Sequence, residues 1–142
     1  MTTEDVWNKY IHSYIIDYQG NIWSGPNAIS LPITTPIHII TACNPNSFML
    51  SNAENTVRNH LLIEKLTNLN IDYVPVIGCS PNKDWSEASF AIQGSNRIDA
   101  CKLANEFDQR AIFELTDDLL MVVCVNTLAV KKSRYRIFEF HN

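Results

Sequence analysis

Residues 37–77 read IHIITACNPNSFMLSNAENTVRNHLLIEKLTNLNIDYVPVI, and the order of patterns in this stretch decides the fold. An apolar run at 37–42 predicts one strand, and a second run at 71–77 predicts another. Between them, Ser51-x-x-Glu54 forms a capping box that opens a helix running to about Asn68. The stretch is therefore a strand, a helix and a strand.

The rest of the chain extends this unit on both sides. Downstream we expect strands at 87–93, 110–115, 119–125 and 134–140, and a helix at 96–107 capped by Ser95. Upstream, a helix at 4–11 and a strand at 14–18 precede a proline-containing loop at 24–36. Without the ends, the order is β-α-β-β-α-β. It predicts an α+β fold with a ferredoxin-like (split β-α-β) core, extra edge strands, a mainly antiparallel sheet and helices on one face.

Length and composition fit a single domain. The chain has 142 residues, of which 46% are hydrophobic, and this is enough for a proper core. We expect residues 1–36 to supply the N-terminal helix, strand and loop. Residues 37–125 then form the core, and residues 126–142 the C-terminal strand.

Charge and cysteine usage exclude several classes of partner. The net charge is −4, whereas proteins that bind DNA or RNA need a basic face, so no nucleic acid is expected. No apolar run reaches the roughly 20 residues that span a bilayer, and the polar, acidic N-terminus does not resemble a secretory leader. The four cysteines, which have no C-x-x-C spacing, predict free thiols in the cytoplasm, with no metal and no cofactor.

The helix after Ser51 changes character along its inner stripe. At 100° per residue, Leu62 and Leu66 fall on a stripe that continues as Asn59, Asn55 and Asn52 toward the N-terminus, with Arg58 at its edge. A buried amide without a partner costs about 1–3 kcal/mol. Two interpretations stay open: the amides bond the carbonyls of neighbouring loops, or they line a pocket in which the helix N-terminus and Arg58 hold a phosphate or carboxylate.

The predicted topology brings further polar residues to the same end of the sheet, because the first strand is the antiparallel neighbour of the third and the fourth. The expected ligand-binding residues are Asn44, Asn55, Arg58, Asn59, Ser80, Trp85, Ser89 and Gln109, and the expected catalytic residue is Glu87. Glu87 is either a general acid or base with a pKa raised by partial burial, or the partner of an internal ion pair with Arg58 or Arg110. Cys43 and Cys79 also follow strands here, as inert side chains, a nucleophile or a metal pair, although no histidine is placed to activate them.

Six short motifs lie along this region. They are Ile39-Ile40-Thr41-Ala42-Cys43-Asn44-Pro45, Glu54-Asn55, Arg58-Asn59, Gly78-Cys79-Ser80-Pro81, Trp85-Ser86-Glu87-Ala88-Ser89-Phe90 and Gln109-Arg110-Ala111-Ile112-Phe113-Glu114. Together they resemble a bacterial family catalogued as domain of unknown function 3293. The resemblance covers roughly residues 37–123. It implies a small bacterial cytoplasmic protein and supplies no activity, cofactor or partner.

Two classes of function are consistent with these patterns. In the first, the protein binds a small anionic or phosphate-bearing ligand at the end of the sheet, either leaving it unchanged or acting on it. In the alternative, it is a protein-interaction or regulatory module without catalytic activity. That module would use an exposed aromatic N-terminus (Trp7, Tyr10, Tyr14 and Trp23) and the last strand, which as an edge strand also allows a homodimer.

Overall fold

The computed structural model describes residues 3–138, which form a curled eight-stranded sheet with three α-helices. The strand order is β2-β1-β4-β5-β3-β6-β7-β8, and every neighbouring pair is antiparallel. The strands are β1 (Tyr14–Asp17), β2 (Ile22–Ser24), β3 (Ile37–Ile40), β4 (Tyr73–Cys79), β5 (Ser86–Gln93), β6 (Ala111–Leu115), β7 (Leu119–Cys124) and β8 (Val130–Tyr135). The helices are α1 (Thr3–Ile11), α2 (Asn52–Asn68) and α3 (Arg97–Glu106), with a short 3-10 turn at Pro45–Ser47.

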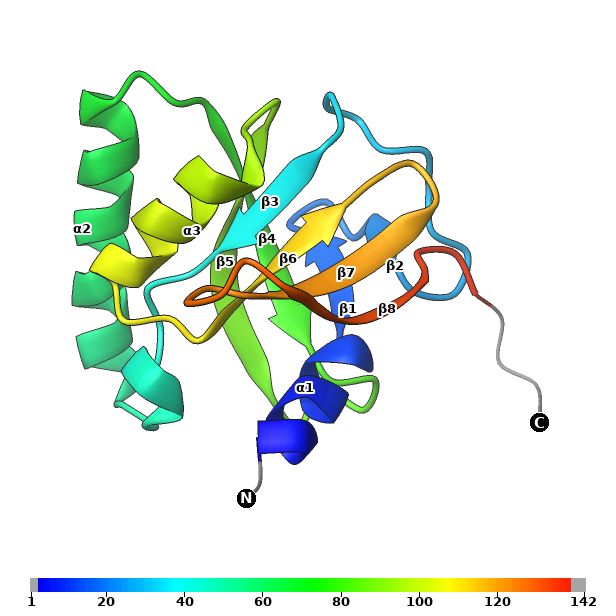
Figure 1. Cartoon of the computed structure of the whole chain (residues 1–142), viewed down its shortest axis with the longest axis horizontal. Helices are drawn as coiled ribbons and strands as arrows, with labels where there is room; N and C mark the ends of the chain where they lie inside the picture. The colour runs from blue at the N-terminus through cyan, green and yellow to red at the C-terminus, as the bar shows by residue number, and fades with distance from the viewer. Residues whose placement is uncertain (1–2, 139–142) are drawn as a thin grey trace.

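The sheet has a hydrophobic core on each face, because side chains alternate between the faces along every strand. In β3, Ile37 and Ile39 belong to one core, which also contains residues of α1 and is called the α1 core below. Ile40 belongs to the other, the α2–α3 core, with Leu62 of α2 and Ala100 of α3. Figure 1 shows α2 and α3 together on one side of the sheet and α1 apart from them. The sheet therefore separates the α1 core on one face from the α2–α3 core on the other.

The curl brings the two edges of the sheet together. Gly25, next to β2, forms a parallel bridge with Ile137, just after β8. Arg136 reinforces this closure: its Nη1 donates to the Trp23 carbonyl at 3.0 Å and to the Ile29 carbonyl at 2.6 Å. The α1 core is therefore enclosed by the sheet itself, with α1 packed beside β7 and β8.

Much of the expected architecture is confirmed. The fold is α+β and the sheet is antiparallel. The four strands predicted as the core lie in the order β4-β5-β3-β6, with both connecting helices on one face. The α1 helix packs on the opposite face, so the helices do not all share one side. A ferredoxin-like core stays a prediction, because four further strands double the width of the sheet.

Two local predictions were wrong. The last strand was expected at 134–140, but β8 spans Val130–Tyr135. A tight turn brings the chain back directly after β7, with Leu128 at a φ of 65° and its N–H bonded to the Cys124 carbonyl at 2.8 Å. Residues 139–142 lie outside the described part of the chain. The cap of α3 is Asn96 rather than Ser95, because the Asn96 side chain accepts the Asp99 N–H.

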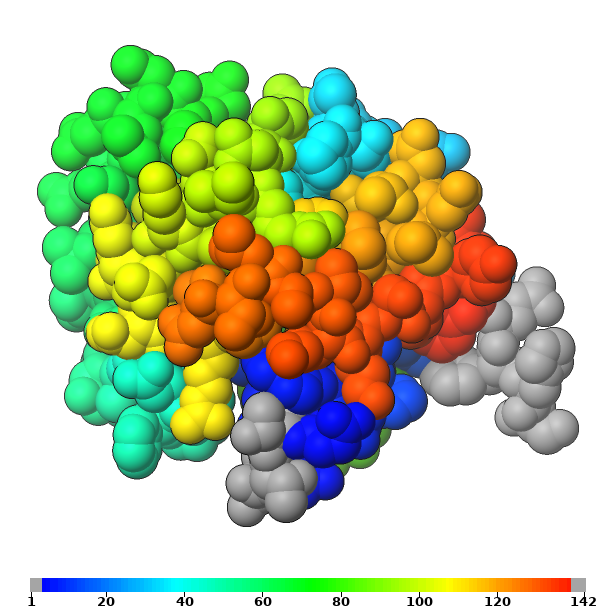
Figure 2. Space-filling model, viewed as in Figure 1, coloured from blue at the N-terminus to red at the C-terminus, as the bar shows by residue number. Residues whose placement is uncertain are grey.

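The aromatic N-terminus is not an exposed surface. Trp7, Tyr14 and Trp23 are buried, and Trp23 has no exposed area at all. Trp7 and Trp23 belong to the α1 core inside the curl, whereas the Tyr14 ring packs against Phe138. The surface between α3 and α1 is covered instead by β8 and its flanking turn, drawn in orange in Figure 2.

Within residues 3–138, no helix combines the length and apolarity needed to cross a bilayer.

Candidate functional site

A cleft of about 370 Å³ opens between α1, the loop after β3 and the start of β5. It is lined by Val6, Lys9, Tyr10, Asn44, Asn46, Ser47, Phe48, Met49, Trp85, Glu87 and Arg110. A much smaller pocket of about 20 Å³, room for roughly one water molecule, lies behind it on the α1 face of the sheet. Tyr10, Trp85 and Glu87 line both spaces, so they stand where the cleft meets the inner pocket.

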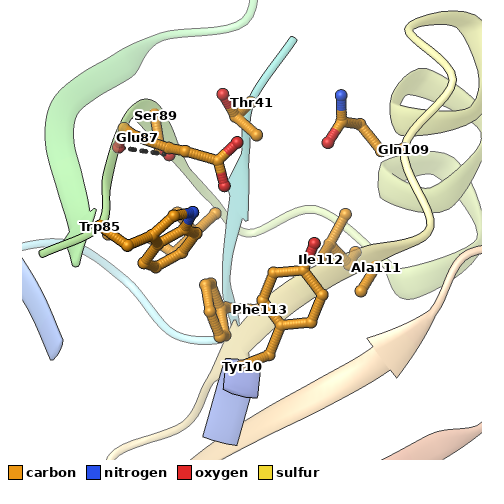
Figure 3. A pocket seen from close by; sticks show the side chains of 11 residues that line it. Tyr10, Thr41, Trp85, Glu87, Ser89, Gln109, Ala111, Ile112 and Phe113 are labelled. Atoms are coloured by element: carbon orange, nitrogen blue, oxygen red, sulfur yellow. Dashed lines mark hydrogen bonds between the residues drawn. The ribbon is translucent and has the colours of Figure 1, made fainter. Parts of the chain in front are cut away.

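The inner pocket is built by side chains that share one face of adjacent strands. Glu87 and Ser89 are two residues apart on β5 and point the same way. Gly78 of β4 lies directly opposite Glu87, where it adds no side chain to the pocket. In Figure 3 the Glu87 carboxyl lies above the rings of Trp85, Tyr10 and Phe113, with Gln109 across the pocket. The result is a small space with an aromatic floor and polar walls.

Among residues 3–138, one hydrogen-bond donor reaches the Glu87 carboxyl, which is partly buried where the cleft meets the inner pocket. The Asn44 amide donates to its Oε2 at 3.1 Å. Burial raises the pKa of Glu87 to about 7, although the Asn44 hydrogen bond and the charge of Lys9 act in the opposite direction. The carboxyl is therefore divided between its acid and carboxylate forms near neutral pH, as a general acid or base requires.

Asn44 has no freedom to turn its amide away from Glu87. Its Oδ1 accepts the Leu50 N–H and the Asn55 amide, each at 2.9 Å, so Nδ2 must face Glu87. Its backbone N–H donates to Asn55 Oδ1 at 2.9 Å. Asn44 and the two residues at 46 and 47 have positive φ angles of 48°, 52° and 67°, a conformation that persists only where the surroundings enforce it. The loop is thus held in an unusual shape at the edge of the cleft.

The N-terminal helix supplies the aromatic wall. The Tyr10 ring meets the Trp85 ring at a centroid distance of 6.3 Å and the Phe113 ring at 5.9 Å, both edge to face. Lys9 Nζ lies 5.0 Å from the centre of the Trp85 ring. The Tyr10 and Ser47 hydroxyls share a hydrogen bond, while burial and the charge of Glu87 raise the Tyr10 pKa. These contacts tie α1 to the residue before β5, to β6 and to the loop after β3.

The amide stripe of α2 lies outside both the cleft and the inner pocket. Asn59 Oδ1 accepts the Ala42 N–H at 2.9 Å, and its Nδ2 donates to the Ala88 carbonyl at 3.2 Å. Arg58 donates to the carbonyls of Ala42 and Phe107, each at 2.6 Å. Of the two interpretations of this stripe, hydrogen bonding to neighbouring backbone is the one that these contacts favour.

Of the remaining predicted residues, some line the inner pocket and others hold a neighbouring loop in place. Gln109 lines the inner pocket and donates to the Cys43 carbonyl at 3.0 Å. Ser80 Oγ accepts the Trp85 N–H at 3.0 Å, which fixes the loop that carries Trp85. The pocket therefore unites Trp85, Glu87, Ser89 and Gln109, and Asn44 joins them from the cleft.

The two cysteines that follow strands near the site show none of the features of reactive thiols. Cys43 and Cys79 are buried, and burial raises the pKa of both. The polar neighbours of Cys43 include Asn59, whose Nδ2 lies 3.3 Å from its sulfur, the Ala88 carbonyl and the Thr41 hydroxyl. Among residues 3–138, no group of three or more His, Cys, Asp or Glu side chains is arranged to hold a metal ion.

Three features of the site were missed from the sequence. Tyr10 and Lys9 come from a helix whose docking depends on the curl of the sheet, and no local pattern predicts that contact. The segment 46–49 looked like an ordinary turn. Its signal was the pair Phe48-Met49, two large apolar residues in a polar loop, which are 72% and 74% exposed.

Comparison with known proteins identifies a family without an assigned activity. No curated protein and no solved structure matches this chain. The model of the family described as "Protein of unknown function (DUF3293)" matches residues 40–112, slightly more than half of the chain. This stretch contains Asn44, Trp85, Glu87, Ser89 and Gln109, and it excludes α1. The chain therefore belongs to the DUF3293 family.

Proposed function

We propose that the cleft binds a small anionic molecule and that Glu87 transfers a proton to or from it. The observation that carries this proposal is the position of Glu87. Its carboxyl stands where the cleft meets the inner pocket and is oriented by Asn44, and its pKa is about 7. A buried carboxyl that only stabilises the fold more commonly has a charged partner, whereas none of the ion pairs among the described residues includes Glu87.

The charges around the cleft support an anionic ligand. Lys9 of α1 and Arg110, directly before β6, both line the cleft, and both side chains are exposed. Arg110 forms no ion pair among the described residues, so its guanidinium is available for a phosphate or carboxylate. Tyr10, Trp85 and Phe48 offer ring faces for a flat or apolar part of the same molecule. A nucleotide or a sugar phosphate combines these properties.

The predicted site residues take two roles in this proposal. Asn44 and Trp85 contact the ligand in the cleft, and Trp85, Ser89 and Gln109 line the inner pocket behind it. Asn55, Arg58, Asn59 and Ser80 hold the loops that carry those residues, because their hydrogen bonds go to neighbouring protein groups. The site is then supported from the opposite face of the sheet by α2.

A screen with NMR detection of the Trp85 indole tests this function. Inorganic phosphate, nucleoside monophosphates and sugar phosphates are titrated into the wild type, Arg110→Met and Glu87→Gln. The expected result is a ligand whose affinity falls at least about tenfold in Arg110→Met, the scale of one charged hydrogen bond. Glu64→Gln, an exposed carboxyl of α2, is the matched control for Glu87. Equal binding by all four proteins, or no shift of the Trp85 signal, contradicts the proposal.

A protein partner is the second candidate, favoured by the exposure of Phe48 and Met49. Large apolar side chains that are nearly three-quarters exposed are the kind of residue that a partner covers. The edge strand β8 is a less suitable surface, because Lys131 and Lys132 place charge along it. Arg110→Met removes the charge that a small anion needs and keeps Phe48 and Met49. It should therefore weaken small-ligand binding and leave such a partner bound, which separates the two functions.

We also infer the finer assignments that the sequence suggested. A ferredoxin-like core is supported by the order β4-β5-β3-β6, with β1, β2, β7 and β8 as additions. A bacterial, cytoplasmic protein is supported by the family resemblance and by the four free cysteines. Limited proteolysis and the thiol count of freshly isolated protein test these two inferences.

A further inference from the structure

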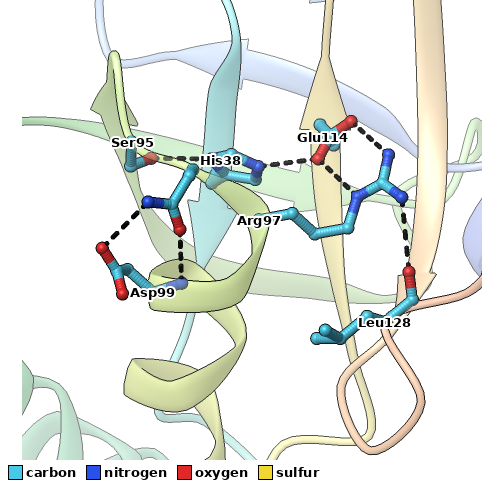
Figure 4. A network of polar contacts seen from close by, with 7 residues as sticks. His38, Ser95, Arg97, Asp99, Glu114 and Leu128 are labelled. Carbon is cyan, nitrogen blue, oxygen red and sulfur yellow. Dashed lines mark hydrogen bonds and ion pairs between the residues drawn. The ribbon is translucent and has the colours of Figure 1, made fainter.

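The α2–α3 face of the sheet carries a second polar cluster, separate from the cleft (Figure 4). His38 of β3 has no exposed area. Its Nε2 lies 2.8 Å from Glu114 Oε1, and its Nδ1 lies 2.6 Å from Ser95 Oγ. The three residues thus form a continuous serine–histidine–carboxylate chain of hydrogen bonds, and the proposed function uses none of them.

The Glu114 end of this hydrogen-bond chain determines where its protons lie. Arg97 donates to both oxygens of Glu114, through Nε at 2.9 Å and Nη2 at 2.8 Å, and these bonds lower the Glu114 pKa. Glu114 is therefore a carboxylate and accepts from His38 Nε2–H. Burial lowers the His38 pKa, so the ring is neutral and Nδ1 keeps its lone pair. The Ser95 hydroxyl must then donate to Nδ1, the arrangement of a nucleophile on its base.

Ser95 is also open to a cleft large enough for a small substrate. It lines a space of about 390 Å³ between α2 and α3. The wall is mainly apolar, from Leu69, Ile71, Ile92 and Leu103, with Lys65, Lys102, Asp99 and Glu106 at the rim. Ser95 directly precedes the Asn96 cap of α3, where the first N–H groups of the helix have no acceptor within it. Such N–H groups, at the positive end of a helix, suit a developing oxyanion.

We propose that Ser95 is the nucleophile of an acyl-transfer site that takes short-chain esters, with His38 as its base and Glu114 orienting His38. Ser95 Oγ attacks the ester carbonyl carbon, and its proton passes to His38 Nδ1. The carbon–oxygen bond to the alcohol breaks, and the alcohol leaves with that proton. Water then attacks the acyl-serine with His38 as base, which releases the carboxylic acid and restores Ser95. This activity goes beyond the proposed function, because it lies on the other face of the sheet.

The full-length protein is tested with p-nitrophenyl butyrate and with an alkyl fluorophosphonate. The expected results are hydrolysis above the buffer rate and a phosphonyl adduct that peptide mass spectrometry locates on Ser95. Ser95→Ala should lower hydrolysis at least about 100-fold, the usual scale of general base catalysis, and abolish the adduct. The control is Ser133→Ala, which removes an exposed serine of β8 and should change neither result.

Circular dichroism and thermal unfolding show whether each variant is folded. If Ser95→Ala fails to fold, Ser95→Cys keeps a nucleophile in place, and its thiol should react with iodoacetamide at least tenfold faster than Cys43 or Cys101, both of which are buried. A folded wild type that hydrolyses the ester at the buffer rate and carries no adduct on Ser95 overturns the proposal. So does equal labelling of Ser95 and Ser133, or a new thiol in Ser95→Cys that reacts no faster than the buried cysteines.

Discussion

Glu87 and Glu114 lie on central strands of the same sheet, yet their surroundings shift their pKa values in opposite directions. Glu87 faces the α1 side, has one amide donor, and its pKa is raised to about 7 by burial. Glu114 belongs to the network on the α2–α3 side, where hydrogen bonds from Arg97 and His38 lower its pKa. Both carboxyls have little contact with solvent. The number and charge of their donors, rather than burial alone, decide which protonation state the fold favours.

The two carboxyls therefore affect stability at opposite ends of the pH range. The Glu87 contribution is fully present below its ordinary pKa of 4.5 and is lost as the pH rises through about 7. The Glu114 contribution is present above pH 4.5 and is lost as the pH falls. Three of the four changes below test this contrast, and Asn59→Leu tests the amide stripe of α2; they run from the largest expected effect to the smallest.

Arg97→Met should remove the difference between the pKa values of Glu87 and Glu114, because it leaves the Glu114 carboxylate without its cation. Breaking a pair of this kind costs about 3–5 kcal/mol, and we expect a loss near the lower limit because Arg97 is partly exposed. Urea unfolding at pH 7 measures it. Lys132→Met breaks the exposed pair with Glu4 and should cost less than about 1 kcal/mol. Equal losses in the two variants would mean that the Arg97–Glu114 pair stabilises the fold no more than the exposed Lys132–Glu4 pair does.

Glu87→Gln should stabilise the protein increasingly as the pH rises. Below pH 4.5 the wild-type carboxyl is protonated and resembles the amide, so the two proteins should differ little. By pH 8 the wild type has lost about 3 kcal/mol relative to the variant, the free energy of a pKa raised from 4.5 to about 7. Urea unfolding at five pH values measures this difference. A difference that stays constant from pH 4 to 8 would show that Glu87 has an ordinary pKa.

Asn59→Leu extends the apolar stripe of α2 and leaves the Ala42 N–H without its acceptor. An unpaired buried N–H costs about 1–3 kcal/mol, and we expect unfolding at pH 7 to show a loss in that range. Asn52→Leu, an exposed amide on the same helix, is the control and should change stability by less than about 0.5 kcal/mol. Unchanged stability of Asn59→Leu would reopen the interpretation that this amide serves a ligand.

Lys9→Met should have the smallest effect on stability, within about 0.5 kcal/mol, because its side chain is exposed. It should still raise the Glu87 pKa further, since the charge of Lys9 lowers it in the wild type. The pH titration of the Trp85 indole signal follows this change. Lys9→Arg keeps the charge and should restore the wild-type titration, whereas an identical titration in all three proteins would remove Lys9 from the surroundings of Glu87.

Features that depend on nearby residues or on the order of the elements were predictable from the sequence. The capping box at Ser51 and Glu54 is confirmed, and α2 ends at Asn68 as expected. The antiparallel pairing of β3 with β5 and β6 is also confirmed, because it follows from element order. Glu87 was selected on the same basis, and it does line the pocket.

Features that depend on distant contacts were not predictable. His38 and Glu114 are 76 residues apart, and neither has a local partner that points to the other. Their signal was subtle: each is a single polar residue inside an otherwise apolar strand. The sequence also did not predict that the pocket lies on the α1 face of the sheet. The docking of α1 depends on the contact between the two sheet edges, at Gly25 and Ile137, which are more than 110 residues apart.

The shortness of β3 has a consequence for how the sequence can change. Its four residues present His38 to the network on one face and Ile39 to the pocket on the other. Side chains alternate along a strand, so gaining or losing one residue here would send the following side chains of this strand to the opposite face. Substitutions can adjust either face independently, but insertions and deletions would disrupt both at once. Differences in length among relatives should therefore accumulate in the 24–36 loop, and this strand should keep its length.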